Sequence, residues 1–285
     1  MSLFPLVLVL VAAIAHASWN LLSKQASQAD GIVFLWLVAA ASSIIWGPVA
    51  IGYLVVTETA PTWTDAAVIT GSTLLHLGYF MLLQRGYRDG DLSIVYPIAR
   101  GTGPMLASAV AVLFLDEHPA PAGVAGIVLV GVGVFMMSGG GAEGDLRGIA
   151  FGLATGVFIA AYTVWDAQVV GAFAVAPILL NYGGEVGRMA FMTPLVLGGR
   201  RPLIGRVWRE HRYRVLGAAV LMPFSYLLVL FAFTMAPVSV VAPMREVSVL
   251  VAVVLGGRLL AEGDLRRRLL AAGVILGGMV TIALS

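Results

Sequence analysis

Long apolar stretches, separated by short polar connections, run along the whole chain. A helix needs about 20 largely apolar residues to cross a bilayer, and the pattern predicts helical spans of about that length. The expected spans are residues 3–24, 32–55, 64–84, 92–115, 121–138, 147–168, 174–198, 213–236, 238–258 and 268–284. No remaining stretch is long enough for a soluble domain. The pattern therefore predicts an all-α integral membrane protein with ten transmembrane helices.

The amino-acid composition agrees with a chain surrounded by lipid. Hydrophobic residues make up 60% of the chain and charged residues only 11%, whereas a soluble domain carries about 25% charged residues. The chain has no cysteine, which excludes disulfides and thiolate metal sites, and we expect no metal site or other cofactor. Its basic residues follow the loops instead of lining a groove, so we expect no nucleic-acid partner.

The positions of lysine and arginine predict the orientation of the chain. All but three of the 17 Lys and Arg residues fall in the odd-numbered predicted loops or at the span ends that border them, and the exceptions, Arg100, Arg188 and Arg245, lie well inside spans. Cytoplasmic loops are enriched in these two residues. The odd loops should therefore face the cytoplasm and both termini the outside, as in a multi-pass protein of the cytoplasmic (inner) membrane.

An internal repeat becomes visible when the chain is aligned with itself at an offset of 146 residues. The matched pairs include Trp19-Asn20 with Trp165-Asp166 and Tyr96-Pro97 with Ala242-Pro243. A five-span unit is odd, so its second copy must begin on the opposite face of the membrane, as in the inverted repeats of secondary transporters. We expect one five-helix repeat in residues 1–139 and a second, inverted repeat in residues 147–285.

Each half also carries a short hairpin that leads into a proline-containing segment, Ser93–Pro97 or Ser239–Pro243. The helix that follows ends near an acidic residue, Glu117 or Glu262, before a glycine-rich final helix. With these motifs the sequence resembles the drug/metabolite transporter superfamily, in particular its EamA-type ten-helix permeases and, among them, the amino-acid exporter branch. The resemblance implies a cavity lined by spans 1, 3, 4, 6, 8 and 9, with 2 and 7 flanking it and 5 and 10 packed behind.

Two oppositely charged residues, Arg100 and Glu246, occupy equivalent positions in the two halves. A charge in the bilayer core is costly unless it has a partner or a function. The repeat directs both residues towards the centre, and Tyr96 shares a helix face with Arg100. The pair either binds the carboxylate and ammonium of an amino acid or closes a gate as a salt bridge, with Arg245 as a further partner.

Two prolines and a neighbouring arginine are candidate gating or hinge residues: Pro97, Pro243 and Arg245. Each proline removes a backbone donor near the start of a helix, which suits either a bend beside a cavity or a proline tolerated in the first turn. Glu185 and Arg188 lie three residues apart on the seventh span, where side chains can pair. The resemblance places that span at the periphery, so we expect a structural pair there.

Aromatic and polar residues on the predicted cavity helices form the expected substrate site. An apolar pocket with a few polar groups is the general form of a small-molecule site, although tryptophan near a helix end also serves as an interfacial anchor. The two histidines among them either relay protons or act as neutral hydrogen-bonding partners. The candidate substrate-binding residues are His16, Trp19, Asn20, His76, Tyr79, Tyr96, Arg100, Tyr162, Trp165 and Glu246.

The expected function is secondary transport, because no nucleotide-binding loop or hydrolase motif points to an enzyme. The best-fitting substrates are small amphipathic metabolites, above all aromatic or bulky apolar amino acids, exported by alternating access. One alternative is a proton-coupled multidrug or cation exporter, which needs a titrating carboxylate such as Glu246 or Glu185; another is an intramembrane enzyme acting on lipid-linked substrates. The expected partners are a small-molecule substrate and the lipid bilayer.

Gly273 and Gly277 suit close helix packing within a monomer or across a weak dimer.

Overall fold

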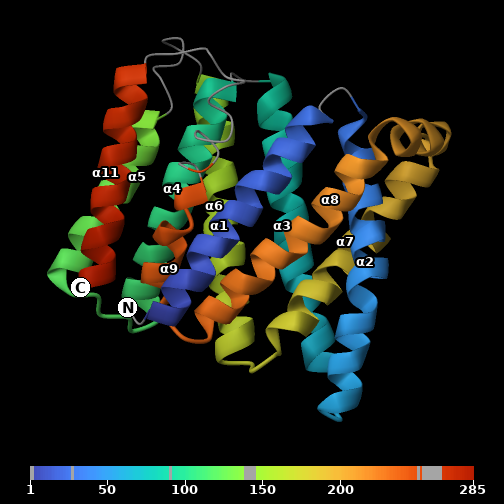
Figure 1. Cartoon of the computed structure of the whole chain (residues 1–285), viewed down its shortest axis with the longest axis horizontal. Coiled ribbons are helices and arrows are strands. Elements are labelled where there is room, and N and C mark those ends of the chain that lie inside the picture. Colours follow the sequence, from blue (N-terminus) through green and yellow to red (C-terminus); the bar gives the residue numbers. More distant parts are fainter. Residues whose placement is uncertain (1–2, 27–28, 90–91, 138–145, 249–250, 252–264) are drawn as a thin grey trace.

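The computed structural model describes residues 3–26, 29–89, 92–137, 146–248, 251 and 265–285, and within these residues all regular structure is helical. The helices pack side by side as one bundle (Figure 1). They are α1 (Leu3–Gln25), α2 (Gly31–Val56), α3 (Trp63–Asp89), α4 (Leu92–Phe114), α5 (Pro121–Met137), α6 (Leu146–Gly171), α7 (Pro177–Leu197), α8 (Arg201–Phe233), α9 (Val238–Met244) and α11 (Leu265–Leu284).

Five of the described helices, α1, α2, α3, α6 and α8, are long and apolar enough to cross a membrane. Large apolar side chains on their outer faces lie open, as Ile44 and Val55 of α2 do with exposed fractions of 76% and 70%. Such a surface is stable in lipid and not in water. The helices therefore indicate a multi-pass membrane protein.

Most predicted spans coincide with helices to within a few residues, and two differ. The eighth helix begins at Arg201 instead of residue 213, because Pro202 suits a first helical turn and Val207 packs against the apolar cluster around α2. The ninth predicted span starts as α9 but the helix ends at Met244, followed by a turn at residues 245–246. Most of the rest of that span lies outside the described residues.

Polar side chains fix several helix ends. Asp30 is the N-cap of α2 and accepts hydrogen bonds from two backbone N–H groups, at 3.1 and 3.0 Å. Glu117, in the connection between α4 and α5, accepts hydrogen bonds from the backbone N–H groups of Val238 and Ser239 at 2.8 and 2.9 Å. These are the first two residues of α9, so a carboxylate from one half of the chain caps a helix of the other half.

The helices pack in pairs that join distant parts of the sequence: α1 against α8, α3 and α4 against α6, α2 between α7 and α8, and α5 against α11. Small residues allow the closest contacts, as expected in lipid. A Cβ added to Gly126 of α5 would lie only 2.6 Å from the carbonyl oxygen of Gly278 on α11. Gly273 and Gly277, by contrast, have no described atom within 4 Å of such a Cβ, so the packing of α5 on α11 does not use them.

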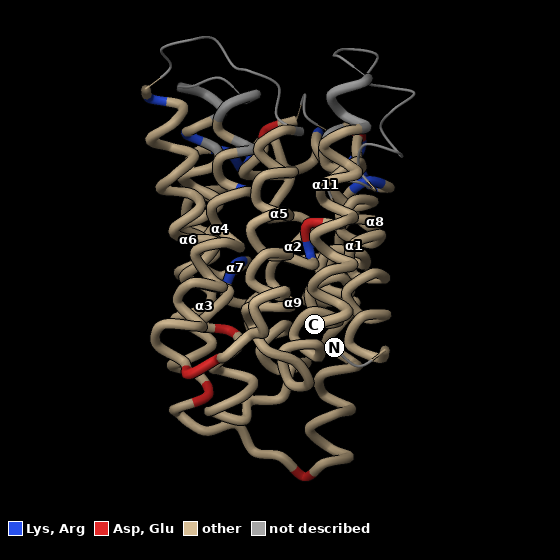
Figure 2. The backbone as a smooth tube through the Cα atoms, turned by 90° about the vertical axis from the view of Figure 1, so that its left-hand side faces the viewer, with Lys and Arg blue, Asp and Glu red and all other residues tan. Residues whose placement is uncertain are grey.

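Charged residues are segregated along the bundle (Figure 2). Most Lys and Arg positions gather towards one end, and most Asp and Glu positions lie towards the other or near the middle. The N and C labels lie towards the acidic end (Figure 1). Many of the basic residues that the sequence assigned to loops, Arg147 among them, lie within the terminal turns of helices instead.

Candidate functional site

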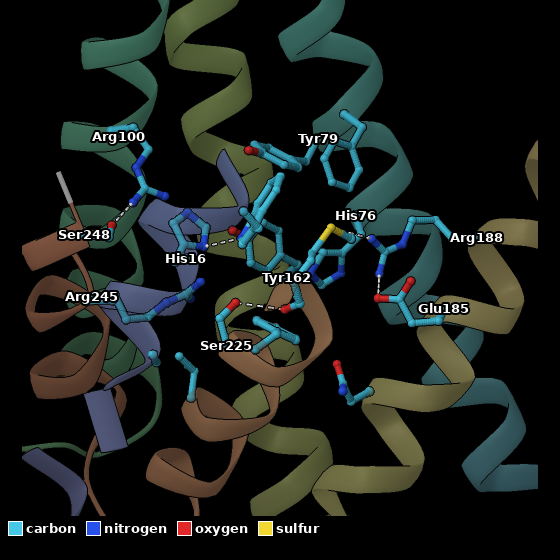
Figure 3. A pocket seen from close by; sticks show the side chains of 18 residues that line it. His16, His76, Tyr79, Arg100, Tyr162, Glu185, Arg188, Ser225, Arg245 and Ser248 are labelled. Atoms are coloured by element: carbon cyan, nitrogen blue, oxygen red, sulfur yellow. Dashed lines mark hydrogen bonds and ion pairs between the residues drawn. The ribbon is translucent and has the colours of Figure 1, made fainter. Parts of the chain in front are cut away.

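A pocket lies near the middle of the bundle, between helices from both halves of the chain (Figure 3). The space free of atoms in the pocket and its mouth, open solvent included, totals about 740 Å³. Its walls come from α1, α3, α4, α6, α7, α8 and the turn after α9. The lining residues are Ala12, Ala13, His16, Trp19, His76, Tyr79, Phe80, Arg100, Tyr162, Asn181, Glu185, Arg188, Met222, Ser225, Tyr226, Val229, Arg245 and Ser248.

Aromatic rings form one wall of the pocket. The imidazole of His76 stacks on Tyr162, with ring centroids 4.1 Å apart and an interplanar angle of 26°. Tyr79 and Tyr226 meet Tyr162 and His76 edge to face at 5.7 and 5.4 Å. Offset and edge-to-face arrangements are the favoured geometries of aromatic pairs. The cluster thus gives the pocket a rigid apolar surface with polar edges.

A second aromatic contact comes from α1. The indole N–H of Trp19 donates a hydrogen bond to Nδ1 of His16 at 3.2 Å, and the two rings lie edge to face at 5.2 Å. The residues lie three positions apart, so the helix itself brings them together. Because Nδ1 accepts this bond, the neutral imidazole carries its proton on Nε2.

A charged pair from α7 lies on the opposite side of the pocket. The guanidinium of Arg188 donates to Oε1 of Glu185 at 2.7 Å, and it sits 5.7 Å from the ring centroid of Phe80. The pair forms as expected from its spacing, but its place differs from expectation. It faces the pocket because α7 contributes to the wall, whereas the resemblance placed this helix beside the cavity.

A second ion pair joins the two halves at the other side of the pocket. Nε of Arg100 lies 3.2 Å from Oε2 of Glu246, and both side chains are almost fully buried. Arg100 also donates to the Ser248 hydroxyl at 3.0 Å. The backbone turn after α9 positions Glu246, whose N–H donates to the carbonyl of Pro243 at 3.1 Å. Arg100 and Ser248 line the pocket, while Glu246 lies behind them.

Arg245 has a different environment from the other two pocket arginines. Its guanidinium lies over the ring of Tyr226, 5.6 Å from the centroid, a cation–π arrangement. Among the described residues it has no carboxylate partner and no side-chain hydrogen bond. It therefore presents to the pocket a planar donor group that no described side chain engages by a hydrogen bond or an ion pair.

The structure brings most of the predicted site residues together. His16, Trp19, His76, Tyr79, Arg100, Tyr162 and Arg245 all line the pocket. Asn20 instead donates to the backbone carbonyl of His16 at 2.8 Å. Trp165 points away: its indole donates to the carbonyl of Val68 at 2.9 Å. Pro243 is buried within α9, and the side chains of Tyr96 and Pro97 lie outside the described part of α4.

Several lining residues were missed, and the sequence did contain a signal for some of them. The 146-residue offset that relates the two halves also relates Tyr79 to Ser225 and Phe80 to Tyr226, and all four line the pocket. The eighth span was expected to line the cavity, and applying the offset to each candidate would have found lining residues on it, Ser225 among them. No such signal marks Asn181, which lines the pocket only because α7 forms part of its wall.

The protein is a membrane-embedded helix bundle, and its central pocket is both aromatic and charged. Such a pocket suits the binding of a small molecule. Within the described residues no group of three or more His, Asp or Glu is arranged to hold a metal ion. Residues 3–139 match the family model of the EamA-like transporter family. This match supports the drug/metabolite transporter superfamily and indicates a membrane transporter of small molecules.

The fold is similar to that of solved structures, of which 29 chains match. One, described only as the crystal structure of a protein, has a TM-score of 0.80 over 98% of this chain and 96% of its own, at 14% sequence identity. At that identity the likeness concerns the fold alone. No curated protein matches the sequence.

Proposed function

We propose that the chain is an EamA-type secondary transporter that exports amino acids with aromatic or bulky apolar side chains across the cytoplasmic membrane. The observation that carries the proposal is that Arg245 has no carboxylate partner among the described residues. Arg100 and Arg188 each have a carboxylate partner, whereas Arg245 has none among the described residues. A guanidinium binds a carboxylate through two parallel hydrogen bonds, so the substrate's carboxylate is the group that fits Arg245.

The rest of the pocket suits the other parts of an amino acid. Glu185 lies across the pocket from Arg245 (Figure 3), and its Oε2 is buried without a hydrogen bond from the described residues. That oxygen is an acceptor for the substrate's ammonium group. The stacked rings of His76 and Tyr162 then offer an apolar surface to the side chain.

We also propose that residues 1–139 and 147–285 are two inverted five-helix repeats. The helix pairs support this architecture, since α1 packs on α8 and its expected counterpart α6 packs on α3. The pairs α2 with α7, α4 with α9 and α5 with α11 join each helix to its own counterpart. A pseudo-twofold axis in the membrane plane produces both kinds of pairing.

The orientation follows from the same proposal. The end of the bundle that carries most of the Lys and Arg residues (Figure 2) faces the cytoplasm, and the acidic end faces outside, by the positive-inside rule. Both termini then lie outside. Labelling of single cysteines introduced into this cysteine-free chain, at Thr59 and at Arg209, tests the orientation with a membrane-impermeant reagent applied to intact cells.

The decisive experiment is transport by purified protein in proteoliposomes. We expect saturable counterflow of an aromatic amino acid and much weaker counterflow of the amine that lacks its carboxylate. Arg245→Gln should raise the half-saturating concentration about 10-fold or more, since a hydrogen bond to a charged group contributes about 1.5–3 kcal/mol. Arg209→Gln, at an exposed position far from the pocket, is the matched control. Absence of saturable flux across a broad amino-acid panel would overturn the proposal.

A multidrug or cation exporter is not favoured by the pocket. The sequence offered Glu185 and Glu246 as titrating groups for that alternative, and both are paired with arginines. The lining also carries three guanidinium groups against one carboxylate, Glu185, which disfavours a cationic substrate. Equal transport of the aromatic amine and the amino acid would favour the cation exporter instead.

A further inference from the structure

A third buried carboxylate, Asp166, lies directly behind the aromatic wall of the pocket. It is on α6, and its side chain is fully buried. The hydroxyl of Tyr226 donates a hydrogen bond to its Oδ2, and Nδ1 of His76 lies 4.0 Å from the same oxygen. Oδ1 is buried and accepts no well-formed hydrogen bond from the described residues, although the Ser72 hydroxyl lies beside the carboxylate. Asp166 thus touches two residues that line the pocket without lining it itself.

Asp166 differs from the other two buried carboxylates in its electrostatic partners. Glu185 and Glu246 each have an arginine within 3.2 Å, whereas no described Lys or Arg forms an ion pair with Asp166. A carboxylate in the membrane interior without a cationic partner is costly when ionised. The titratable and charged groups on the elements around it are His76 on α3, Arg100 on α4, Tyr162 on α6, Glu185 and Arg188 on α7, Tyr226 on α8, and Arg245 and Glu246 after α9.

The tautomer of His76 favours contact with this carboxylate. Nδ1 of His76 lies 2.9 Å from the backbone carbonyl of Ser72, and a carbonyl oxygen only accepts. Nδ1 therefore carries a proton, which it donates to this carbonyl, and Oδ2 of Asp166 lies 4.0 Å from the same nitrogen. The imidazole ring itself is stacked on Tyr162 in the pocket wall, so it connects the pocket with the buried carboxylate.

Tyr226 connects Asp166 with the proposed carboxylate anchor. One end of the phenol donates to Asp166, and its ring face carries the guanidinium of Arg245. An ionised Asp166 attracts Arg245 through this low-dielectric layer and so competes with a substrate carboxylate for the same cation. A protonated Asp166 leaves the charge of Arg245 to the substrate.

We propose that Asp166 is a proton-binding site linked to the pocket, so that one proton and the substrate are bound and carried together. The inference rests on the proposed transport function. In each cycle the carboxylate takes a proton from water on one side, becomes a neutral acid, and returns the proton to water on the other side. Substrate leaving the cell down its own gradient then takes a proton with it. Linkage requires the reciprocal effect: protonation strengthens substrate binding by the factor with which substrate strengthens proton binding.

The test uses proteoliposomes loaded with an aromatic amino acid and diluted into substrate-free buffer, with a pH-sensitive dye inside. Wild-type protein should show substrate efflux together with alkalinisation of the interior. Asp166→Asn should keep efflux and abolish the pH change, and Asp166→Glu should retain part of it. The matched control is Asp116→Asn, because the Asp116 side chain is 95% exposed; it should behave as wild type.

Binding measurements with purified protein test the same inference for variants that transport poorly. Substrate affinity of the purified wild type should weaken by about 5-fold or more from pH 5.5 to pH 8.5, a usual size for coupling between two sites. In Asp166→Asn the affinity should stay constant and strong. Efflux by wild type without a pH change, efflux that follows a sodium gradient, or a pH dependence that persists in Asp166→Asn overturns the inference and leaves the transport function intact. Absence of wild-type efflux overturns the transport function itself.

Discussion

The ion pair between Arg100 and Glu246 offers a quantitative test of how the two halves of the bundle are joined. Nε and Oε2 lie 3.2 Å apart, and the side chains are only 9% and 3% exposed. At an effective dielectric constant of about 20, two charges at this distance attract by about 5 kcal/mol, and much of that offsets their desolvation. Removing one partner leaves the other charge buried and unpaired, which costs about 3–5 kcal/mol.

The perturbation is a double-mutant cycle with Arg100→Met, Glu246→Met and both together. Each single variant should lose about 3 kcal/mol or more of the free energy of unfolding, measured by denaturant titration in mixed micelles. The double variant should lie within about 1 kcal/mol of wild type, because a well-packed apolar pair replaces an ion pair at little cost. Ser248→Ala measures the separate hydrogen bond from the charged Arg100, at about 1.5–3 kcal/mol.

Additive losses in the double variant would refute this reasoning. Additivity would mean that the charges are not coupled, and that Arg100 and Glu246 are stabilised by other groups. A coupled pair whose double variant still binds an amino acid would assign the pair to the scaffold. Loss of binding with intact stability would assign it to substrate contact.

Three further predictions follow from particular contacts. Glu117→Ala should lower the free energy of unfolding by about 1–2 kcal/mol, because the N–H groups at the start of α9 lose their acceptor; Glu117→Gln, which keeps an acceptor, should lose less in the same titration. Gly126→Val should cost about 1–3 kcal/mol through overpacking against Gly278, while Gly273→Val, at an open position, should stay within about 0.5 kcal/mol. Asp30→Ala should cost about 1 kcal/mol through loss of the α2 cap, measured as a lower midpoint of thermal unfolding.

The helices were predictable because each span has to satisfy a strong and local condition. About 20 apolar residues and the Lys/Arg pattern are enough to place most spans within a few residues of their helices. The start of α8 was not predictable in this way, since residues 201–212 carry many charges. That segment is helical because of Pro202 and the packing of Val207, which hydropathy does not detect.

Pocket residues were predictable only where the internal repeat or the spacing along a helix indicated them. Arg100 and Tyr162 were found because their positions and spans point to the centre. Trp165 was a candidate because it matches Trp19, but the same helix turns its indole towards Val68. The residues of α7 line the pocket because of where this helix sits in the bundle. Its position depends on packing against α2 and α3, and no local sequence pattern predicts that packing.

Equivalent positions in the proposed repeats carry different chemistry in the pocket, and this difference has a consequence for recognition. A pocket with two identical halves would present the same groups to a substrate in either orientation, so it would not orient a zwitterion. Here the matched pairs are His16 with Tyr162, His76 with Met222, Phe80 with Tyr226 and Arg100 with Glu246. The guanidinium of Arg245 lies over Tyr226 and that of Arg188 lies over the matched ring of Phe80. Of these two arginines, only Arg188 forms an ion pair with a described carboxylate, Glu185. In the proposed repeats, this side-chain divergence would give the substrate one preferred direction, while the shared arrangement of helices would still allow the two halves to exchange conformations.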